Sequence, residues 1–515
     1  MGGLATGGEE DEAAMAGARI TPRAQDYAQW YQDVVREGGL AEAAEVVRGC
    51  MVIKPHGYAV WEKMQADLDR RFKETGHQNA YFPLLIPLSF LAKEAQHVEG
   101  FAMECAVVTH SGLKAHDGKI SVKNELEEPY VVRPTSETII GHFFKKWIDS
   151  YRDLPMLLNQ WANVMRWELR TRLFLRTGEF LWQEGHTAHA THEEAQEEVA
   201  RMLDVYRDFA HEVMALPVIQ GVKTENERFA GAVETRCIEA LMQDGKALQA
   251  GTSHDLGQNF GKAFDVTFQN QQGAREHVWQ TSWGVSTRLV GAVVMAHSDD
   301  DGLVLPPRIA PTQIVLLPIH RTDEERARVL EACRGLEAAL GAVRYGDEPI
   351  RVRTDARDMR GGDKVWQHVK QGVPVRVEIG PRDLAAGAVS VSRRDRGPRE
   401  RVALPLESFP AAAPALLEEI QRGLYDRALA FREARTVRVA DRAELVARFA
   451  DEGATGEGQG GFVITHVADT PEVAAVCDPL KVTVRCIPMD GPDDPGRCII
   501  TGQPVQRPSV LARAY

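Results

Sequence analysis

Apolar side chains near the start of the chain recur at helical spacing. Four of them lie three or four residues apart: Trp61, Met64, Leu68 and Phe72. This spacing predicts a helix that begins near Gly57 and stops at Gly76. A second helix is predicted after Thr191 and Glu194, which have the spacing of a capping box. Its apolar stripe comprises Ala195, Val199, Met202, Tyr206, Phe209 and Val213.

Strand patterns lie between and around these helices. Residues 81–87 are apolar but contain two prolines, which favours an edge or interface strand over a central one. A short strand is predicted at 130–132, and a hairpin at 173–189 that turns at Thr177 and Gly178. Because strands and helices come in blocks here, we expect an antiparallel sheet flanked by helices.

The rhythm changes after residue 311. The pattern now alternates between predicted strands and predicted helices, at 313–317, 324–340, 364–370, 375–379 and 388–392. This alternation indicates a small, separate α/β domain. Pro410 and Pro414 open another helical segment, and a glycine-rich loop at 453–461 precedes the last part of the chain.

Length and composition narrow the class of protein. The chain has 515 residues, which at roughly 150 residues per domain predicts about three domains. It is 44% hydrophobic and 26% charged, and no apolar run approaches the roughly 18 residues of a membrane span. The first basic residue is Arg19 and residues 9–12 are acidic, unlike a signal or transit peptide. We therefore expect a cytoplasmic protein without a membrane span.

Cysteine usage and charge agree with that expectation. Seven scattered cysteines are typical of reduced thiols. The net charge of −13 argues against a chain coated for non-specific nucleic-acid binding. It leaves open the recognition of RNA through a local basic patch.

Two segments around the predicted hairpin carry candidate chemistry. Arg166 and Glu168 precede it, and Arg176 and Thr177 lie at its turn. Arginines beside a turn can hold phosphate, and Glu168 could orient an amine or a metal ion. The alternative is a solvated hairpin with cross-strand ion pairs.

Three other segments have both a functional and a structural interpretation. Thr135 and Glu137 could bind a ligand, or Thr135 could cap the helix that follows. Residues 249–254 place polar side chains around a glycine that a ligand could approach, but the same pattern is typical of a turn. Arg288 is expected near a helix N-terminus, a suitable place for an anion, although a lone arginine there is usually structural.

The order and spacing of these segments carry more information than any one of them. Together they resemble the three signature motifs of class II aminoacyl-tRNA synthetases. The first is a strand ending in proline at Pro83, the second a hairpin with Arg166 and Glu168, and the third a strand and helix with Gly284 and Arg288.

A closer resemblance is to prolyl-tRNA synthetases of the archaeal/eukaryotic-like type. It is carried by residues 135–137, 180–186 and 376–383, and it covers residues 20–400 strongly and the C-terminus weakly. The resemblance implies an α/β multidomain fold in which helices flank an antiparallel class II sheet. Its expected parts are a disordered N-terminus (1–20), a catalytic domain (21–308), an anticodon-binding α/β domain (309–405) and a small α+β C-terminal domain (406–515).

The resemblance also implies a reaction and its site. ATP activates L-proline as prolyl-adenylate, which passes proline to proline tRNA and releases AMP. The attacking carboxylate is already ionised, so the site must align it and stabilise added negative charge. The expected catalytic residues are Arg166, Glu168 and Arg288. The ATP site would add Arg176, Thr177, Gln249, Thr252 and Ser286, with Mg²⁺ accompanying the nucleotide.

Proline itself presents an ammonium group, a carboxylate and an apolar ring. The resemblance assigns the ammonium to Thr135 and Glu137, and the carboxylate to Arg166. The remaining expected pocket residues are Trp182, Glu184, Phe229, His254 and Ser282, with Phe180 beside them.

For the tRNA, the resemblance points to the α/β domain. The basic residues of 393–401 are candidates for phosphate contacts. Lys364 and Glu378 are candidates for reading the anticodon, and a surface-charge role for either is the alternative.

Two features depart from related enzymes. The C-terminal domain of this type commonly holds zinc between cysteine pairs, but here Cys477, Cys486 and Cys498 have no common zinc-site spacing, so we expect no metal. The final residues Ala514 and Tyr515 still match the family. Residues 186–248 leave no room for the large editing domain of bacterial-type enzymes.

We therefore expect a homodimeric ligase. Two rivals stay open: a class II synthetase for another small amino acid, and a regulatory paralogue that has lost catalysis. Thr135 with Glu137 favours proline. The intact set of Arg166, Glu168 and Arg288 argues against lost catalysis.

Overall fold

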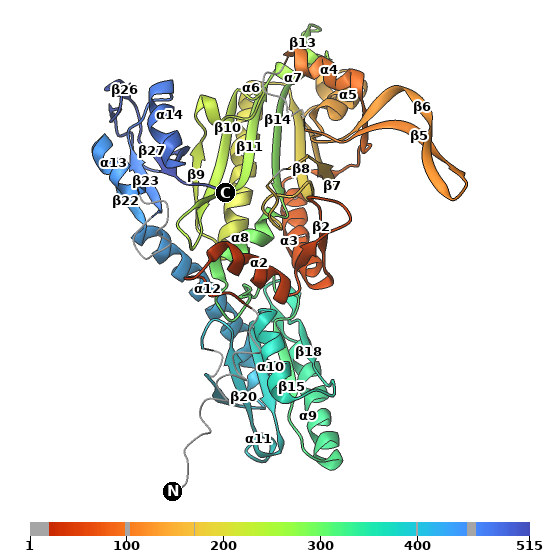
Figure 1. Cartoon of the computed structure of the whole chain (residues 1–515), viewed down its shortest axis with the longest axis vertical. Helices are drawn as coiled ribbons and strands as arrows, with labels where there is room; N and C mark the ends of the chain where they lie inside the picture. Colours follow the sequence, from red (N-terminus) through yellow and green to blue (C-terminus); the bar gives the residue numbers. More distant parts are fainter. Residues whose placement is uncertain (1–19, 98–103, 169, 398–399, 451–459) are drawn as a thin grey trace.

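The structure is a computed structural model that describes residues 20–97, 104–168, 170–397, 400–450 and 460–515. The molecule is elongated, with a large sheet at one end and a small α/β domain at the other (Figure 1). The expected disorder of 1–20 and the glycine-rich loop at 453–461 concern residues that lie almost entirely outside these ranges. In the described ranges, no helix is long and apolar enough to cross a bilayer.

One large sheet forms the centre of the molecule. Its strands are β3 (Gln78–Asn79), β7 (Met156–Met165), β8 (Glu179–His189), β9 (Val218–Val222), β10 (Glu234–Leu241), β11 (Ala247–Gly257), β14 (Trp279–Ser286), β22 (Thr436–Arg438), β23 (Phe462–Thr465), β24 (Thr483–Pro488) and β27 (Ser509–Ala512). They lie in the order β22-β23-β27-β24-β9-β10-β11-β14-β8-β7-β3. Only the outermost pairs, β22–β23 and β3–β7, are parallel, so the predicted antiparallel sheet is confirmed.

Helices bury their apolar faces against this sheet. They are α2 (Tyr27–Glu37), α3 (Pro55–Glu74), α6 (His192–Asp208) and α8 (Arg288–His297). The predicted faces of α3 and α6 are buried, which confirms both helices. The Thr191 side chain accepts a hydrogen bond from the Glu194 backbone N–H, as a cap should. The Glu194 carboxylate reaches Ala190 instead of closing a full capping box.

A smaller sheet projects from the side of the large one. It comprises β4 (Leu85–Pro87), β5 (Val107–His116) and β6 (Lys119–Val132), in the order β4-β6-β5, and it lies beside α4 (Leu88–His97) and α5 (Glu137–Trp147). β4 is an edge strand, as predicted for 81–87. The predicted strand at 130–132 is only the end of β6, which forms a long protruding hairpin with β5 (Figure 1).

Two other sequence-based interpretations are wrong. The hairpin expected at 173–189 has β7 as its first strand, and residues 166–178 form the connection to β8. The apolar residues 173–175 resemble a strand in sequence, but they belong to that connection, and Phe174 and Leu175 are apolar because they are buried in the core. Residues 249–254 do not form a turn, because they lie within β11, where Gly251 pairs with Ile238 of β10.

The α/β domain has the predicted elements. Its strands lie in the order β18 (Val352–Thr354), β15 (Ile314–Pro318), β19 (Val375–Ile379), β20 (Ala388–Arg393) and β21 (Val402–Pro405). Three helices accompany them: α9 (Asp323–Gly341), α10 (Gly361–Lys370) and α11 (Pro381–Ala385). β15 is parallel to both neighbours, and the remaining pairs are antiparallel.

The C-terminal segment returns to the large sheet. Helix α12 (Phe409–Ala434) leads back from the α/β domain, and α13 (Arg442–Phe449) and α14 (Pro471–Cys477) flank the last strands (Figure 1). β24 pairs with β9, so one sheet continues through both regions. At this junction Glu239 is buried between Lys223, at 2.8 Å, and Arg485, at 3.0 Å.

The remaining short elements connect these parts. They are β1 (Ala41–Ala43), β2 (Met51–Ile53), α7 (Asn259–Ala263), β12 (Thr267–Gln269), β13 (Arg275–His277), β16 (Arg344–Tyr345), β17 (Glu348–Pro349), β25 (Gly496–Arg497), β26 (Pro504–Val505), η1 (Tyr151–Asp153), η2 (Phe209–Val213), η3 (Glu225–Glu227) and η4 (Asp478–Leu480). Residues 190–246, all described, form only α6, η2, β9, η3, β10 and their connections. No inserted domain therefore lies in this span.

Candidate active site

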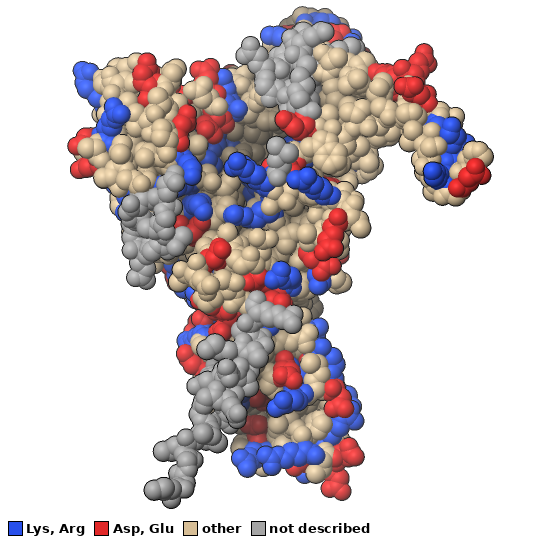
Figure 2. Space-filling view, viewed as in Figure 1, with Lys and Arg blue, Asp and Glu red and all other residues tan. Residues whose placement is uncertain are grey.

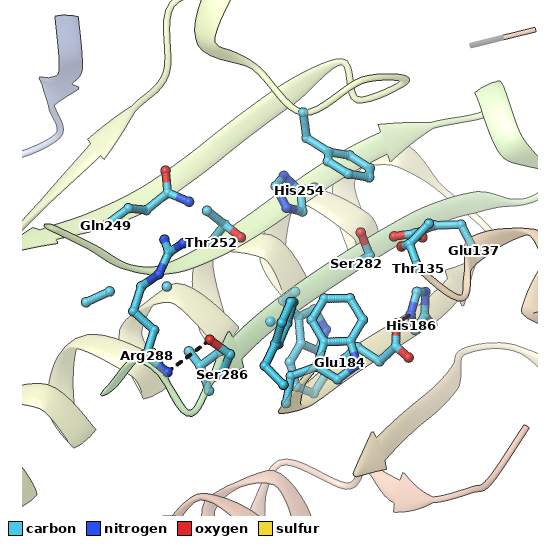
Figure 3. A pocket seen from close by; sticks show the side chains of 18 of the residues that line it. Thr135, Glu137, Glu184, His186, Gln249, Thr252, His254, Ser282, Ser286 and Arg288 are labelled. Atoms are coloured by element: carbon cyan, nitrogen blue, oxygen red, sulfur yellow. Dashed lines mark hydrogen bonds and ion pairs between the residues drawn. The ribbon is translucent and has the colours of Figure 1, made fainter. Parts of the chain in front are cut away.

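Two adjoining cavities open on the face of the sheet made by β8, β11 and β14. One has a volume of about 170 Å³ and the other of about 210 Å³, and both are lined by Arg166, Phe180, Ser286 and Arg288. Every site residue predicted in the large domain lines one of them. Figure 3 shows Gln249, Thr252, Ser286 and Arg288 at one end, and Thr135, Glu137, Glu184 and His186 at the other. The structure therefore assembles side chains that are far apart in the sequence.

Thr135 and Glu137 project into the cavity of about 170 Å³ from the start of α5. Both are buried, and the Thr135 hydroxyl donates a hydrogen bond to the Glu137 carboxylate. The capping alternative for Thr135 is wrong, because Ser136 occupies the N-cap position and its side chain makes no capping bond. The hydroxyl and carboxylate thus face the cavity together.

Glu184 is held in a network beneath this end. Its carboxylate accepts hydrogen bonds from Ser136, from Gln160 at 2.8 Å and from His186 at 3.0 Å. Burial alone would raise the pKa of Glu184, but these bonds, with that from His186 foremost, lower it overall. Burial likewise opposes charge on His186, yet pairing with Glu184 raises its pKa. The two side chains form a buried ion pair.

His254 lines the same end, but unlike His186 it carries no charge. Burial, followed by the nearby charge of His186, lowers its pKa to about 3, so the ring is neutral. It lies 4.6 Å from the ring of Phe229. The buried Ser282 hydroxyl and Trp182 indole nitrogen have no partner in the described residues. Buried polar groups are nearly always hydrogen-bonded, so these two are free to bind a ligand.

Three arginines converge on the other end. Arg166 donates to the Pro134 carbonyl at 2.8 Å and lies over Phe180 and Trp182. Burial lowers the pKa of Arg288, and the positive charges of Arg176 and Arg166 lower it further. Among the described residues, the structure records no ion pair for any of the three. Arg166 and Arg288 are half-buried and Arg176 is exposed. Converging arginines without ion pairs form a strong site for an anion with several charges.

The remaining side chains of this end already make hydrogen bonds within the protein. The Thr177 hydroxyl donates to the Glu179 carbonyl at 2.7 Å, and the Ser286 hydroxyl accepts from the Arg288 backbone N–H at 3.2 Å. One Glu168 oxygen accepts from the Arg170 backbone N–H at 2.9 Å. Glu168 is the one carboxylate among the described residues that line the cavity of about 210 Å³, and it could bind a hydrated Mg²⁺ on phosphates.

Positive side chains also mark this region on the surface. Figure 2 shows Lys and Arg gathered around the hollow in the middle of the large domain, whereas both signs mix elsewhere on this face. The surface around the hollow is therefore positive, although the net charge of the whole chain is −13. A basic rim suits the approach of a polyanion.

The two residues predicted to read an anticodon lie apart. Lys364 is buried on α10, donates to the Asp355 carbonyl at 3.2 Å and lines a polar cavity of about 540 Å³. Glu378 on β19 is paired with Arg401 at 2.9 Å and does not line that cavity.

The basic segment 393–401 is largely used inside the molecule. Arg394 is buried and holds the Asp299 carboxylate with both terminal nitrogens, while Arg393 pairs with Asp395. Arg394 is therefore engaged inside the protein, and the expectation that this segment contacts tRNA phosphates stays a prediction.

The C-terminal cysteines lie in the core. Cys477 and Cys498 pack in one apolar cluster and Cys486 in another, and Cys498 accepts from the Thr501 N–H at 3.3 Å. Within the described ranges, no three His, Cys, Asp or Glu side chains are arranged to hold a metal ion. The expected absence of zinc stays a prediction.

Comparison with known proteins adds independent information. Residues 120–297 match the class II core domain of synthetases for G, H, P, S and T, and residues 313–415 match an anticodon-binding domain. The proline–tRNA ligase of Bdellovibrio bacteriovorus is 56% identical over 503 residues, covering 97% of this chain and 100% of that protein. The chain belongs to the proline–tRNA ligases. This family of class II synthetases joins proline to its tRNA, as the sequence motifs indicated.

Other relatives agree. Proline–tRNA ligase 2 of Anaeromyxobacter dehalogenans is 55% identical and covers 98% of this chain and 100% of its own length. A crystal structure of Cryptosporidium parvum prolyl-tRNA synthetase with halofuginone and AMPPNP is similar, with a TM-score of 0.87, 34% identity and 97% of each chain covered. The fold class expected from the motifs is therefore confirmed.

Sequence reasoning missed part of the site. His186, Trp283 and Val285 also line the cavity that holds Thr135 and Glu137, but no role was predicted for them. The alternation in β8 was a usable signal, because Glu184 and His186 stand two residues apart and so share a sheet face. Trp283 had no comparable signal in the sequence. In the structure its ring packs on Gly185 so closely that a Cβ at that position would lie 2.0 Å from it.

Proposed function

We propose that this proline–tRNA ligase forms prolyl-adenylate in the paired cavities and then transfers proline to proline tRNA. The observation that carries the proposal is the contrast between the two ends. One end offers a buried carboxylate and hydroxyl, and the other offers three arginines that make no ion pair with any described residue. Proline and the triphosphate of ATP have matching charges.

At the first end, proline binds through its ammonium group and its ring. The ammonium has two N–H donors and one positive charge, which Glu137 and Thr135 can accept. The ring fits among Phe180, Trp182 and Phe229, and Glu184 is a further pocket residue. His254 and Ser282 supply polar groups on the other side of the pocket. The carboxylate then points toward Arg166, between the two ends.

At the second end, ATP binds with its phosphates on Arg176 and Arg288. The adenosine side contacts Gln249, Thr252, Ser286 and Thr177. Mg²⁺ would be held by Glu168 and the phosphates, where it would neutralise part of their charge.

The chemical step needs alignment and charge stabilisation. A proline carboxylate oxygen attacks the α-phosphorus, and the bond to diphosphate breaks. Arg166 contacts both the carboxylate and the α-phosphate, so it stabilises the charge that grows between them. A ribose hydroxyl of the tRNA terminus then attacks the acyl carbon, and AMP leaves.

The assignments outside the cavities complete the proposal. Lys364 and Glu378 read the anticodon. The three domains comprise residues 21–308, 309–405 and 406–515. The enzyme works in the cytoplasm.

We propose that the enzyme acts as a homodimer. Exposed apolar side chains gather on the small sheet and its hairpin: Tyr81, Leu85, Leu113, Ile120 and Val122. Such a patch is typical of a protein interface. Sedimentation analysis should give twice the chain mass.

Amino-acid-dependent ATP–pyrophosphate exchange tests the function. Each standard amino acid is supplied separately, and proline should give the fastest exchange by far. Faster exchange with another small amino acid would favour that rival assignment. No exchange from folded protein would favour a regulatory paralogue.

A further inference from the structure

Thr235 lies directly behind the proposed proline pocket without lining it. It belongs to β10, is 2% exposed and pairs in register with His254 of β11. Neither cavity includes it. Any effect of Thr235 on the substrate must therefore pass through residues that do line the pocket.

The Thr235 hydroxyl joins two such residues. It accepts the Phe229 backbone N–H at 3.0 Å, and its oxygen lies 2.9 Å from His254 Nδ1. Phe229 belongs to the connection between η3 and β10, whereas His254 belongs to the sheet. One hydroxyl thus ties a connecting segment to a rigid strand and brings the two rings together (Figure 3 shows His254 at the cavity).

The same hydroxyl determines which nitrogen of His254 carries the hydrogen. The neutral ring has one donor and one acceptor nitrogen. No other acceptor is recorded for the Thr235 hydroxyl in the described residues, so its hydrogen goes to Nδ1. Nε2 then carries the ring hydrogen and offers a donor. Of the charged groups of proline, only the carboxylate can accept it.

We propose that Thr235 is a positioning residue for proline selection, which holds Phe229 against the pocket and keeps His254 as an Nε2–H donor. The proposal rests on the proposed function, because it needs Phe229 and His254 to contact proline. It predicts an effect on the amino acid and none on ATP. A threonine that only fills the sheet would affect both through stability.

The test compares Thr235→Val with Thr235→Ser. Valine keeps the shape and removes the hydroxyl, whereas serine keeps the hydroxyl. Thr235→Val removes the common partner of the Phe229 N–H and of His254 Nδ1, so both rings lose their fixed position and KM for proline should rise roughly 5- to 100-fold. KM for ATP should stay within about twofold, and Thr235→Ser should restore KM for proline to within about threefold.

A matched control is available on β14, the strand that pairs with the other side of β11. Thr281 is 1% exposed, its hydroxyl bonds Thr187, and it does not line the cavities. Thr281→Val should leave the ratio of the two KM values unchanged.

The preference for proline over alanine gives a further measurement. Thr235→Val should lower this preference, because alanine lacks the ring that Phe229 contacts.

Several results would overturn the proposal. They are an unchanged KM for proline in Thr235→Val, an equal rise for proline and ATP, or no rescue by serine. If the wild type does not activate proline, the proposed function itself fails. If Thr235→Val does not fold, ¹⁵N-histidine NMR of the wild type decides, and an Nδ1–H form of His254 would contradict the proposal.

Discussion

The two ends of the active-site cavity differ in how their charges are compensated. At the proline end, Glu184 has His186 as a counter-ion and two further donors, and Thr135 bonds Glu137. At the phosphate end, the charges of Arg166 and Arg176 oppose that of Arg288, and no ion pair of the three is recorded in the described chain. Arg166 is also attracted by the carboxylates of Glu137 and Glu184. Glu184 is paired without substrate, whereas the three arginines gain an ion-pair partner only from a bound anion.

This difference has a physical reason. Proline is small and nearly neutral overall, so selecting it requires fixed geometry, which buried networks provide. ATP brings several negative charges, so the protein can leave positive charges unpaired and gain affinity when they are neutralised. Such sites reduce the stability of the empty protein.

The largest expected effect concerns stability at the two ends. Glu184→Gln should destabilise the protein by about 3–5 kcal/mol, because it leaves the buried charge of His186 without its partner. Arg288→Met should be neutral or stabilising, because it removes a buried, repelled charge. Urea unfolding without ligands measures both. Equal losses would show that the two ends do not differ in charge compensation.

The next effect concerns the rate. Arg166→Ala should slow proline-dependent exchange roughly 100- to 1000-fold, or about 2.7–4 kcal/mol, because it removes a donor to charge that grows in the transition state. Arg170→Ala is the matched control, since that side chain is exposed on the same connection and does not line the cavities. A folded Arg166→Ala protein within about threefold of wild type would remove Arg166 from the chemistry.

A smaller effect concerns pH. The pKa of His254 is about 3 in the folded protein, below its ordinary value of 6.5, so only the unfolded chain takes up a proton as pH falls below about 6.5. Stability is therefore lost toward acid pH, by about 2 kcal/mol from this residue between pH 8 and pH 5. His189 and His297, with pKa values of about 4, act in the same direction.

Unfolding at several pH values checks this prediction. His254→Gln should flatten the acid loss of stability. His116→Gln is the control, because that ring is exposed on the hairpin. An unchanged slope in His254→Gln would mean that His254 is not neutral in the folded state.

Local patterns of the sequence predicted much of the fold. The stripes of α3 and α6 and the alternation of the α/β domain depend on neighbouring residues, and all were confirmed. The pairing of β24 with β9 could not be predicted, because it joins Ile487 to Val222 across more than half the chain. β7 was missed because both of its faces are partly covered, so its sequence lacks clear alternation.

The candidate site could not be predicted from local patterns in the same way. Its residues were found through the order of motifs, and local interpretation of the same segments was less reliable. Residues 249–254 resemble a turn because they are polar, yet they are polar because that strand faces the cavity. The convergence of the three arginines depends on packing between segments that are far apart in the sequence, so only the structure shows it.

The most direct test of the difference between the ends is a pair of substitutions measured against both substrates. Glu137→Gln should raise KM for proline at least about tenfold, since it weakens a charged hydrogen bond, and leave KM for ATP within about threefold. Arg176→Ala should do the reverse. Both are measured by proline-dependent ATP–pyrophosphate exchange over a full range of each substrate. Opposite selectivity is the predicted result, and a similar rise of both KM values in both variants would contradict it.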